Sequence, residues 1–265
     1  MNAFERAGHS VRYRSIRKRG WKKLLDRRWD LVAVAGGDGA VAKVAITLAA
    51  RRKMPLAVIP SGRANNIARA LGLQTGRREG RLAVAVARGP WGKTHFVESA
   101  GVGPIASLMT REGLSFRAGV VQLRRAFEAA RPIALRVRAD GEDLSGDYLM
   151  AQVLNVNAIG PRLELARDAD PGDEWLELLL IRPEQRQVFM TFLAARARGK
   201  AARCPIATIR ARRIEIGGWP ARQNGQVDDR PWPDRRSPRV GKVRIRVATQ
   251  RVLAARVKGD RLADH

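Results

Sequence analysis

The sequence predicts an α/β domain followed by a β-sandwich domain. Two βα units near the N-terminus indicate the first domain, because apolar runs at residues 31–35 and 55–60 each end in a glycine-bearing turn and precede a helical pattern. Such continuous apolar runs are typical of strands buried on both faces of a parallel sheet. Short segments between Asp-Gly, Gly-Pro and Pro-Gly turns indicate the second domain, because this repetition is typical of antiparallel sandwiches.

The first residues predict the end of a helix over 2–8, capped by Gly8, and then a strand over 10–15, where side chains alternate. A doubly wound α/β domain normally begins with a strand before that helix. No such strand precedes Asn2, so we expect either that the first strand of the parallel sheet and its turn have been lost or that the start site is truncated; the sequence does not distinguish the two. Residues 21–29 have apolar side chains at helical spacing and predict another helix.

The boundary between the domains is expected where the pattern changes, giving an α/β domain over residues 1–80 and a β-rich domain over 81–265. Two helix-like segments, 120–130 and 184–198, interrupt the second domain, and their apolar stripes indicate packing against a core. Short strands are predicted over residues 96–102, 133–139, 148–156, 176–181, 206–216 and 243–247.

The composition describes a folded and strongly basic protein. Of 265 residues, 45% are hydrophobic, which is enough for one large core or two ordinary ones. The 51 Lys and Arg residues exceed the 25 Asp and Glu residues and give a net charge of +26, which favours phosphate-rich partners such as nucleotides and anionic membranes. The basic residues are scattered and only 5% of residues are aromatic, so we expect no dedicated nucleic-acid partner.

The single cysteine, Cys204, excludes an internal disulfide bond and offers no cysteine cluster for a metal, which fits a cytoplasmic protein. The sequence contains no apolar run near the ~20 residues that a membrane span needs, and it shows no apolar signal segment. Any membrane contact is therefore expected to be peripheral.

A phosphate-binding loop is expected where the first buried strand ends. Gly36, Gly37 and Gly39 permit a tight turn and allow backbone N–H groups to approach an anion closely. The helix that follows places its positive end at the same point. Because ligands of α/β proteins bind at the carboxyl ends of the strands, this loop is a candidate nucleotide site.

Two motifs resemble the catalytic domain shared by bacterial diacylglycerol kinases, sphingosine kinases and related lipid kinases. They are Gly-Gly-Asp-Gly at 36–39 and Pro-Ser-Gly-Arg-Ala-Asn-Asn-Ile-Ala-Arg-Ala-Leu-Gly-Leu at 60–73. NAD kinases carry a similar first motif but lack the second. The likeness continues at residues 96–103, Asn155 and 170–178, so it covers most of the chain.

The resemblance implies an α/β nucleotide domain and a β-sandwich domain with the active site in the cleft between them. It also implies that the γ-phosphoryl group of ATP is transferred, with Mg²⁺, to a lipid hydroxyl. This chemistry requires mainly positioning and charge neutralisation. By this resemblance the residues that contact the nucleotide are Gly36, Gly37, Asp38, Gly39, Ala40, Ser15 and Arg63, and Asp38 is also assigned to catalysis.

Three positions of these motifs depart from the family pattern. Ala40 and Arg63 stand where the family usually has threonine. Asn66 replaces a common aspartate, but asparagine is also frequent at that position in the family. Ala40 removes a hydroxyl group that could bond a phosphate. Arg63 has two interpretations, because its guanidinium group could bind a phosphate through two hydrogen bonds or could fill the nucleotide pocket.

The metal is expected near Asp173, with backbone oxygens around Asp170 and Trp175 as further ligands, since a hard cation prefers oxygen ligands. The alternative is that this segment is only a turn rich in acidic residues. Spacing alone does not distinguish the two interpretations.

The catalytic base can be aligned in two ways. The family has an Asp-Gly-Glu near its C-terminus whose aspartate takes the proton from the lipid hydroxyl. If residues 226–231 match the family's Gln-Val-Asp-Gly-Glu-Pro, Asp228 is the base; if Asn224 takes that place, both acids have become amides, which cannot accept the proton. The flanking Gln, Val and Pro favour Asp228. The triplet that begins at Asp140 lies between two predicted strands and is expected to be a hairpin turn.

The sequence therefore predicts an ATP-dependent lipid kinase that acts on diacylglycerol or a similar lipid alcohol. The basic surface would support peripheral contact with the anionic inner surface of the membrane, where each Lys or Arg contributes on the order of 1 kcal/mol. The alternative is a catalytically impaired family member that binds a nucleotide or a lipid without phosphoryl transfer.

Overall fold

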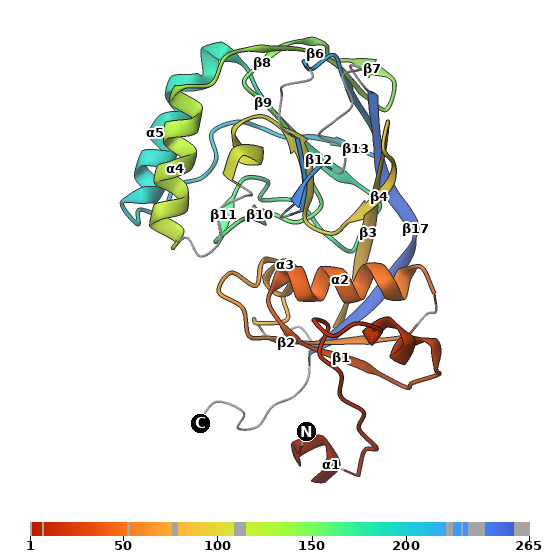
Figure 1. Ribbon diagram of the computed structural model, residues 1–265. Coiled ribbons are helices and arrows are strands. Elements are labelled where there is room, and N and C mark those ends of the chain that lie inside the picture. The colour runs from red at the N-terminus through yellow and green to blue at the C-terminus, as the bar shows by residue number, and fades with distance from the viewer. Residues whose placement is uncertain are drawn as a thin grey trace.

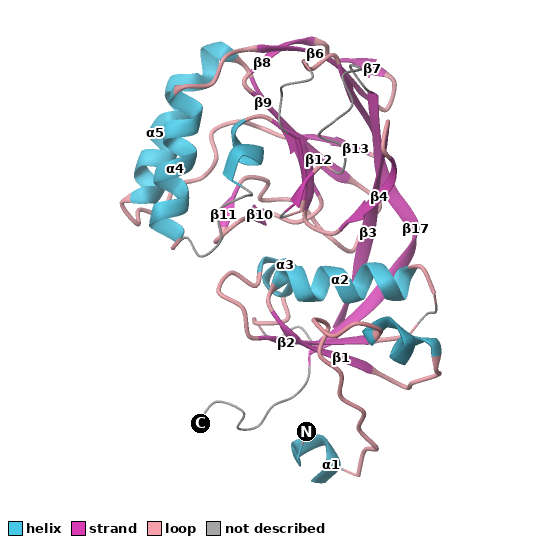
Figure 2. Ribbon diagram, in the orientation of Figure 1, coloured by secondary structure: helices cyan, strands magenta, loops and turns pink. Residues whose placement is uncertain are grey.

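Figure 1 shows the computed structural model of the chain, in which a sandwich with two flanking helices lies above a smaller α/β half. Figure 2 shows the same view by secondary structure. The structure describes residues 2–6, 8–51, 54–75, 79–108, 115–220, 225–228, 230–232 and 242–256.

The α/β half contains the two predicted βα units. β1 (Val32–Gly36) pairs in parallel with β2 (Leu56–Pro60), with Val34 opposite Val58. Each strand leads through a glycine-bearing turn to a helix, α2 (Asp38–Ala49) after β1 and α3 (Asn66–Ala70) after β2. The apolar face of α2 packs on these strands, which confirms the α/β class of this half.

The N-terminal segment differs from its prediction. α1 (Asn2–Arg6) is a helix followed by Gly8 at φ 81°, as expected, but residues 10–15 do not form a strand. Alternating side chains alone do not make a strand, since the backbone also needs a paired neighbour. The helix expected over residues 21–29 is a shorter 3₁₀ helix, η1 (Trp21–Asp26), which buries Trp21 and Leu25.

Two long strands run through both halves of the molecule. β3 (Glu79–Gly89) and β17 (Lys242–Arg256) pair antiparallel, with a register shift between Val247 and Arg251. At its end β17 also pairs in parallel with β2, with Ala254 opposite Leu56. The division of the chain after residue 80 stays a prediction. The structure adds that this point lies inside β3 and that β17 returns to the sheet of β1 and β2 (Figure 1).

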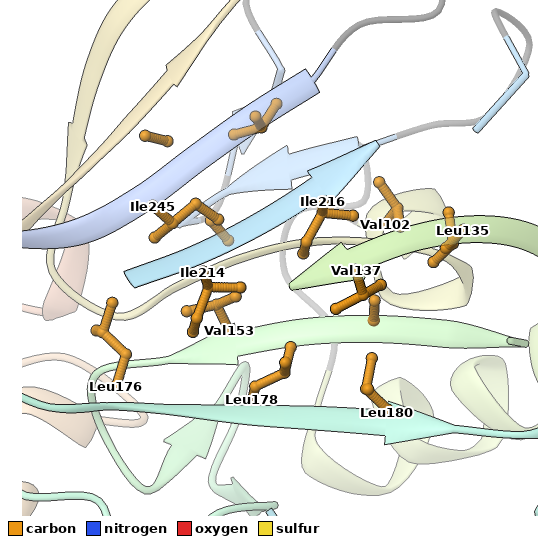
Figure 3. Close-up of a cluster of buried hydrophobic side chains, with 14 of the residues drawn as sticks. Val102, Leu135, Val137, Val153, Leu176, Leu178, Leu180, Ile214, Ile216 and Ile245 are labelled. Carbon is orange, nitrogen blue, oxygen red and sulfur yellow. The ribbon is translucent and has the colours of Figure 1, made fainter. Parts of the chain in front are cut away.

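The sandwich consists of two antiparallel layers, which confirms the predicted class of the second half. Figure 3 shows side chains from both layers meeting in one core, among them Val137, Ile214 and Leu178. The first layer continues the large sheet through β4 (Gly92–Phe96), β6 (Ile133–Ala139), β7 (Glu142–Asp143), β8 (Gly146–Tyr148) and β14 (Arg213–Gly217). The second layer contains β5 (Ser99–Val102), β9 (Met150–Leu154), β12 (Leu176–Ile181), β13 (Ile209–Ala211), β15 (Gly225–Val227) and β16 (Arg230–Pro231).

Two helices cover the outer face of the second layer. α4 (Phe116–Glu128) and α5 (Arg186–Ala197) pack side by side (Figure 2). Their buried side chains belong to a third apolar cluster, which they share with β9 and β12. Both overlap the helices predicted from the sequence. The shorter elements are η2 (Pro104–Leu108), η3 (Pro183–Gln185) and the hairpin of β10 (Ala158–Ile159) and β11 (Leu163–Glu164).

The predicted strands over 133–139 and 176–181 match β6 and β12, whereas others are interrupted. The strand predicted over 96–102 breaks at Val97 and Glu98, because their N–H groups bind the side chain of Asp228 instead of a neighbouring strand. Within the described ranges, no helix combines the length and the apolar character needed to cross a membrane.

Candidate active site between the two halves

The two glycine-bearing turns of the α/β half touch each other through their backbones. A side-chain carbon added at Gly62 would lie 2.3 Å from the Cα of Gly37, so only glycine permits this approach. The Ser61 N–H donates to the Gly36 carbonyl at 3.2 Å. Both turns follow the carboxyl ends of parallel strands, where α/β proteins bind their ligands.

Asp38 joins the first turn to the second. It is the first residue of α2, and its Oδ1 accepts the N–H of Ile67 in α3 at 2.9 Å. Burial raises the pKa of Asp38 above its ordinary value, although the N–H groups around it favour the ionised form. Gly39 and Ala40 follow in the first turn of α2, where a helix presents free N–H groups and a positive dipole end.

The second turn is closed by Asn65, which has a left-handed backbone with φ 53°. Its side chain exchanges two hydrogen bonds with Gly62, at 3.0 Å from N–H to Oδ1 and 2.7 Å from Nδ2 to the carbonyl. Arg63 is exposed, and its carbonyl accepts Nη2 of Arg162 at 2.8 Å. Ser15 lies in the segment before η1, where the next carbonyl, of Ile16, accepts Nζ of Lys43 in α2 at 3.5 Å.

Asp228 lies in the sandwich half, in the turn between β15 and β16, with φ 51°. Its Oδ1 accepts three backbone N–H groups, from Val97 at 3.1 Å, Glu98 at 2.7 Å and Ser99 at 3.3 Å, while among the described residues Oδ2 accepts only the Val97 N–H, at 3.2 Å. Burial is the largest influence and raises the pKa of Asp228 from 3.8 to about 6. A base with such a pKa is ionised at neutral pH and close to the optimum for proton transfer.

The two other candidates for the base are placed differently. Asp140 and Gly141 form the turn between β6 and β7, which confirms the predicted hairpin. The Asp140 carboxylate accepts the N–H groups of Arg212 and Arg213, so it caps that loop. Asn224 lies outside the described residues.

Glu98 and two asparagines connect Asp228 to the α/β half, and no role for the Glu98 side chain was predicted from the sequence. Asn66 Nδ2 donates to Oε2 of Glu98 at 3.2 Å and to the Gly160 carbonyl at 2.8 Å. Asn155, which the family resemblance did point to, donates through Nδ2 to the carbonyls of Val97 at 2.7 Å and Ala83 at 3.2 Å. The motif at residues 96–103 was the available signal, but it does not show which side chains face the other half.

The residues expected to hold the metal form a different arrangement. Asp173 Oδ1 accepts the N–H of Trp175 at 2.8 Å, and Oδ2 contacts the guanidinium group of Arg210 at 2.5 Å. Asp170 Oδ1 accepts the N–H of Gly172 at 2.7 Å. The Arg210 cation takes the place that a metal ion would need at Asp173, so these residues do not fit a cation site. Across the described residues, no cluster of three or more His, Cys, Asp or Glu side chains could hold a metal.

A basic cavity of about 840 Å³ lies apart from these residues, between the N-terminal segment and η1. Its wall contains Tyr13, which is 74% exposed, and five cationic side chains that have no ion-pair partner within the described part of the chain. These cationic residues are Arg12, Arg14, Arg19, Lys23 and Arg27.

Two family models match consecutive parts of the chain. Residues 3–95 match the diacylglycerol kinase catalytic domain, and residues 101–229 match the YegS C-terminal NAD kinase beta sandwich-like domain. The junction between the two matches lies beside Glu98, where the two halves of the structure meet.

Curated relatives and solved structures agree with these matches. The chain is similar to a diacylglycerol kinase of Bacillus subtilis strain 168, with 27% identity over 76% of this chain and 72% of the relative. It is also similar to a diacylglycerol kinase of Mycobacterium tuberculosis, with 24% identity over 71% of this chain and 66% of the relative. Its fold resembles a crystal structure of a diacylglycerol kinase from Bacillus anthracis strain Sterne, with a TM-score of 0.60 and 18% identity, covering 86% of this chain and 78% of the other. The chain therefore belongs to the diacylglycerol kinase-like family.

Proposed function

We propose that the protein is an ATP-dependent lipid kinase that phosphorylates the hydroxyl group of diacylglycerol or a similar lipid alcohol. One observation carries the proposal: a buried carboxylate with a pKa of about 6, Asp228, is linked by hydrogen bonds to the glycine turns of the α/β half. The family membership supports a kinase-type transferase, and the named relatives are diacylglycerol kinases.

The proposed reaction needs a phosphate site and a base on opposite sides of the reacting atoms. The N–H groups at Gly37 and in the first turn of α2 would hold the phosphates of ATP. Oδ2 of Asp228, the less engaged oxygen, would take the proton from the lipid hydroxyl. The oxygen would then form a bond to the γ-phosphorus as the bond to the bridging oxygen breaks, and ADP would leave.

Mg²⁺ is part of the proposal only as the counter-ion expected for ATP in this family. Since Asp173 is already paired with Arg210, we assign no step of the reaction to a metal at that position. Chain residues therefore carry the positioning and proton transfer described above.

Contact with an anionic membrane is a second part of the proposal, because the lipid acceptor would lie in a bilayer. The net charge of +26 supports it, and the basic cavity beside Tyr13 is a candidate for the contact surface. Clustered Lys and Arg side chains attract anionic lipid surfaces without inserting into them.

The test is phosphoryl transfer from labelled ATP, with Mg²⁺, to a panel of lipid alcohols in mixed micelles. Transfer to one lipid, lost in Asp228→Asn and retained in Asp140→Asn, is the expected result. Asp140 is the matched control, because it also sits in a hairpin turn with a left-handed backbone but caps a distant loop. Nucleotide binding without transfer to any lipid would instead identify a catalytically impaired family member.

A further inference from the structure

Glu98 is a half-buried carboxylate at the junction of the two halves, and the reaction proposed above gives it no part. It occupies the interruption between β4 and β5. Its N–H donates to Oδ1 of Asp228 at 2.7 Å, and its carbonyl accepts the N–H of Asn155 at 2.9 Å. The backbone of Glu98 is therefore tied to the candidate base.

The side chain of Glu98 reaches the α/β half. Its Oε2 accepts Nδ2 of Asn66, the first residue of α3, at 3.2 Å. Asn66 is only 1% exposed, so this contact is shielded from water and from competing partners. The next N–H along α3, that of Ile67, donates to Oδ1 of Asp38 at 2.9 Å. A continuous path of covalent and hydrogen bonds thus runs from the first glycine turn to Asp228.

We propose that Glu98 is a positioning residue, which holds the carboxylate of Asp228 at a fixed distance from the phosphate-binding turns. The inference rests on the proposed function, in which a base on one half must meet a phosphate held by the other. Small displacements between such groups are costly, because much of the rate of a phosphoryl transfer comes from alignment. Glu98 is well placed for this task, since its backbone belongs to one half and its side chain bonds to the other.

The contact with Asn66 needs a hydrogen-bond acceptor at position 98. Glutamine and alanine substitutions are therefore expected to have different effects. Asn66 Nδ2 is the donor, so glutamine can accept the same bond through its amide oxygen, whereas alanine cannot. Without the bond, the turn at residues 97–99 is released and its N–H groups no longer hold Oδ1 of Asp228. These N–H bonds favour the ionised carboxylate, so their loss raises the pKa of Asp228 further.

The experiment compares Glu98→Ala and Glu98→Gln by two readouts. One is kcat and KM as a function of pH, and the other is a ¹³C NMR titration of the Asp228 carboxyl group, assigned by its loss in Asp228→Asn. In Glu98→Ala we expect kcat to fall about tenfold or more at unchanged KM for ATP, as misalignment predicts. The titration midpoint of Asp228 should rise by about half to one pH unit. In Glu98→Gln, kcat should stay within about threefold of the parent value, and the Asp228 midpoint should stay within about a few tenths of a pH unit of it.

The matched control is Arg162→Ala. Arg162 also makes a hydrogen bond between the halves, to the Arg63 carbonyl at 2.8 Å, but among the described residues it makes no hydrogen bond or ion pair with Asp228. We expect the Asp228 midpoint to be unchanged in this variant. The positive charge of Arg230 in β16 also lowers the pKa of Asp228. Arg230 is present in the parent and in every variant compared, so its effect does not differ between them.

If Glu98→Ala does not fold, Asn66→Asp provides the second variant, because it replaces the donor with a carboxylate that repels Glu98. The same upward shift of the Asp228 midpoint is expected. A lower melting temperature with an unchanged midpoint would overturn the proposal, and so would a glutamine variant as impaired as the alanine variant. A parent protein that phosphorylates no lipid would refute the proposed function, while the NMR titration would still decide the role of Glu98.

Discussion

Replacing Asp228 with asparagine should abolish catalysis and yet stabilise the fold at neutral pH. Burial raises the pKa of this carboxyl group from 3.8 to about 6, so the folded state holds its proton more tightly than the unfolded chain does. Between these pH values the folded protein binds more protons, and its stability therefore falls as pH rises through that window. Each pKa unit corresponds to roughly 1.4 kcal/mol, so the loss approaches about 3 kcal/mol above pH 6.

Asparagine at position 228 removes the negative charge while keeping the shape of the side chain. Its oxygen can accept the N–H groups of Val97, Glu98 and Ser99 as Oδ1 does, and asparagine tolerates the left-handed backbone at φ 51°. The variant carries no charge to bury. We therefore expect Asp228→Asn to match the parent near pH 4 and to exceed its unfolding free energy by up to about 3 kcal/mol near pH 8.

The assay is urea unfolding of both proteins at several pH values from 4 to 8, alongside lipid phosphorylation. Asp143→Asn is the control of opposite sign, because hydrogen bonds from Ser145 lower the pKa of the exposed Asp143 carboxyl group. That group stabilises the fold above its ordinary pKa, and the benefit is lost as pH falls. Parallel stability curves for the parent and Asp228→Asn would show that the carboxylate is not destabilised by burial. Loss of at least about a hundredfold in kcat is expected for a missing base, so near-normal turnover would refute the catalytic assignment.

Four further outcomes are expected. Gly62→Ala should lower the unfolding free energy by about 1–3 kcal/mol and abolish nucleotide binding in calorimetry, because the new carbon would lie 2.3 Å from the Gly37 Cα. Gly119→Ala lies inside α4, where the new carbon would be 3.4 Å from Cγ of Pro161, an ordinary contact. This substitution should leave the unfolding free energy unchanged or raise it. EDTA should leave the melting temperature unchanged, since Arg210 already pairs with Asp173; a marked decrease would show that a metal supports the fold. Co-sedimentation with anionic vesicles should weaken when three arginines of the basic cavity become serine, whereas serine at the exposed Arg136 and Arg138 of β6 should have little effect. The triple variant replaces Arg12, Arg14 and Arg19.

Features encoded by local patterns could be predicted from the sequence. The buried strands β1 and β2, the turns after them and the hairpin at Asp140 all have signals within a few neighbouring residues. Strands β6 and β12 were found at their observed bounds, because their apolar side chains and turn residues delimit them. The division into an α/β part and a β-sandwich part could be predicted because the βα pattern gives way to short strands between turns.

Features that depend on distant partners could not be predicted in the same way. The contact of Glu98 with Asp228 joins residues 130 positions apart, and nothing in the neighbouring sequence marks it. The strand predicted over residues 243–247 extends to Arg256, because β3 and β2 supply pairing partners that the sequence after residue 247 does not signal. Likewise, the acidic pattern near Asp173 indicated a cation site, while the partner that occupies it, Arg210, lies in a later strand.

The return of β17 to β2 has a consequence for the order in which the protein can fold. The residues that complete the first parallel sheet lie roughly 200 positions after the strand they pair with. A ribosome must therefore synthesise the chain through β17 before that strand can pair with β2, and until then this edge of β2 remains open. Such long-range pairing favours slow folding. A truncation that removes β17 should consequently yield a nascent chain that associates with chaperones, even though every residue of the glycine turns has been made.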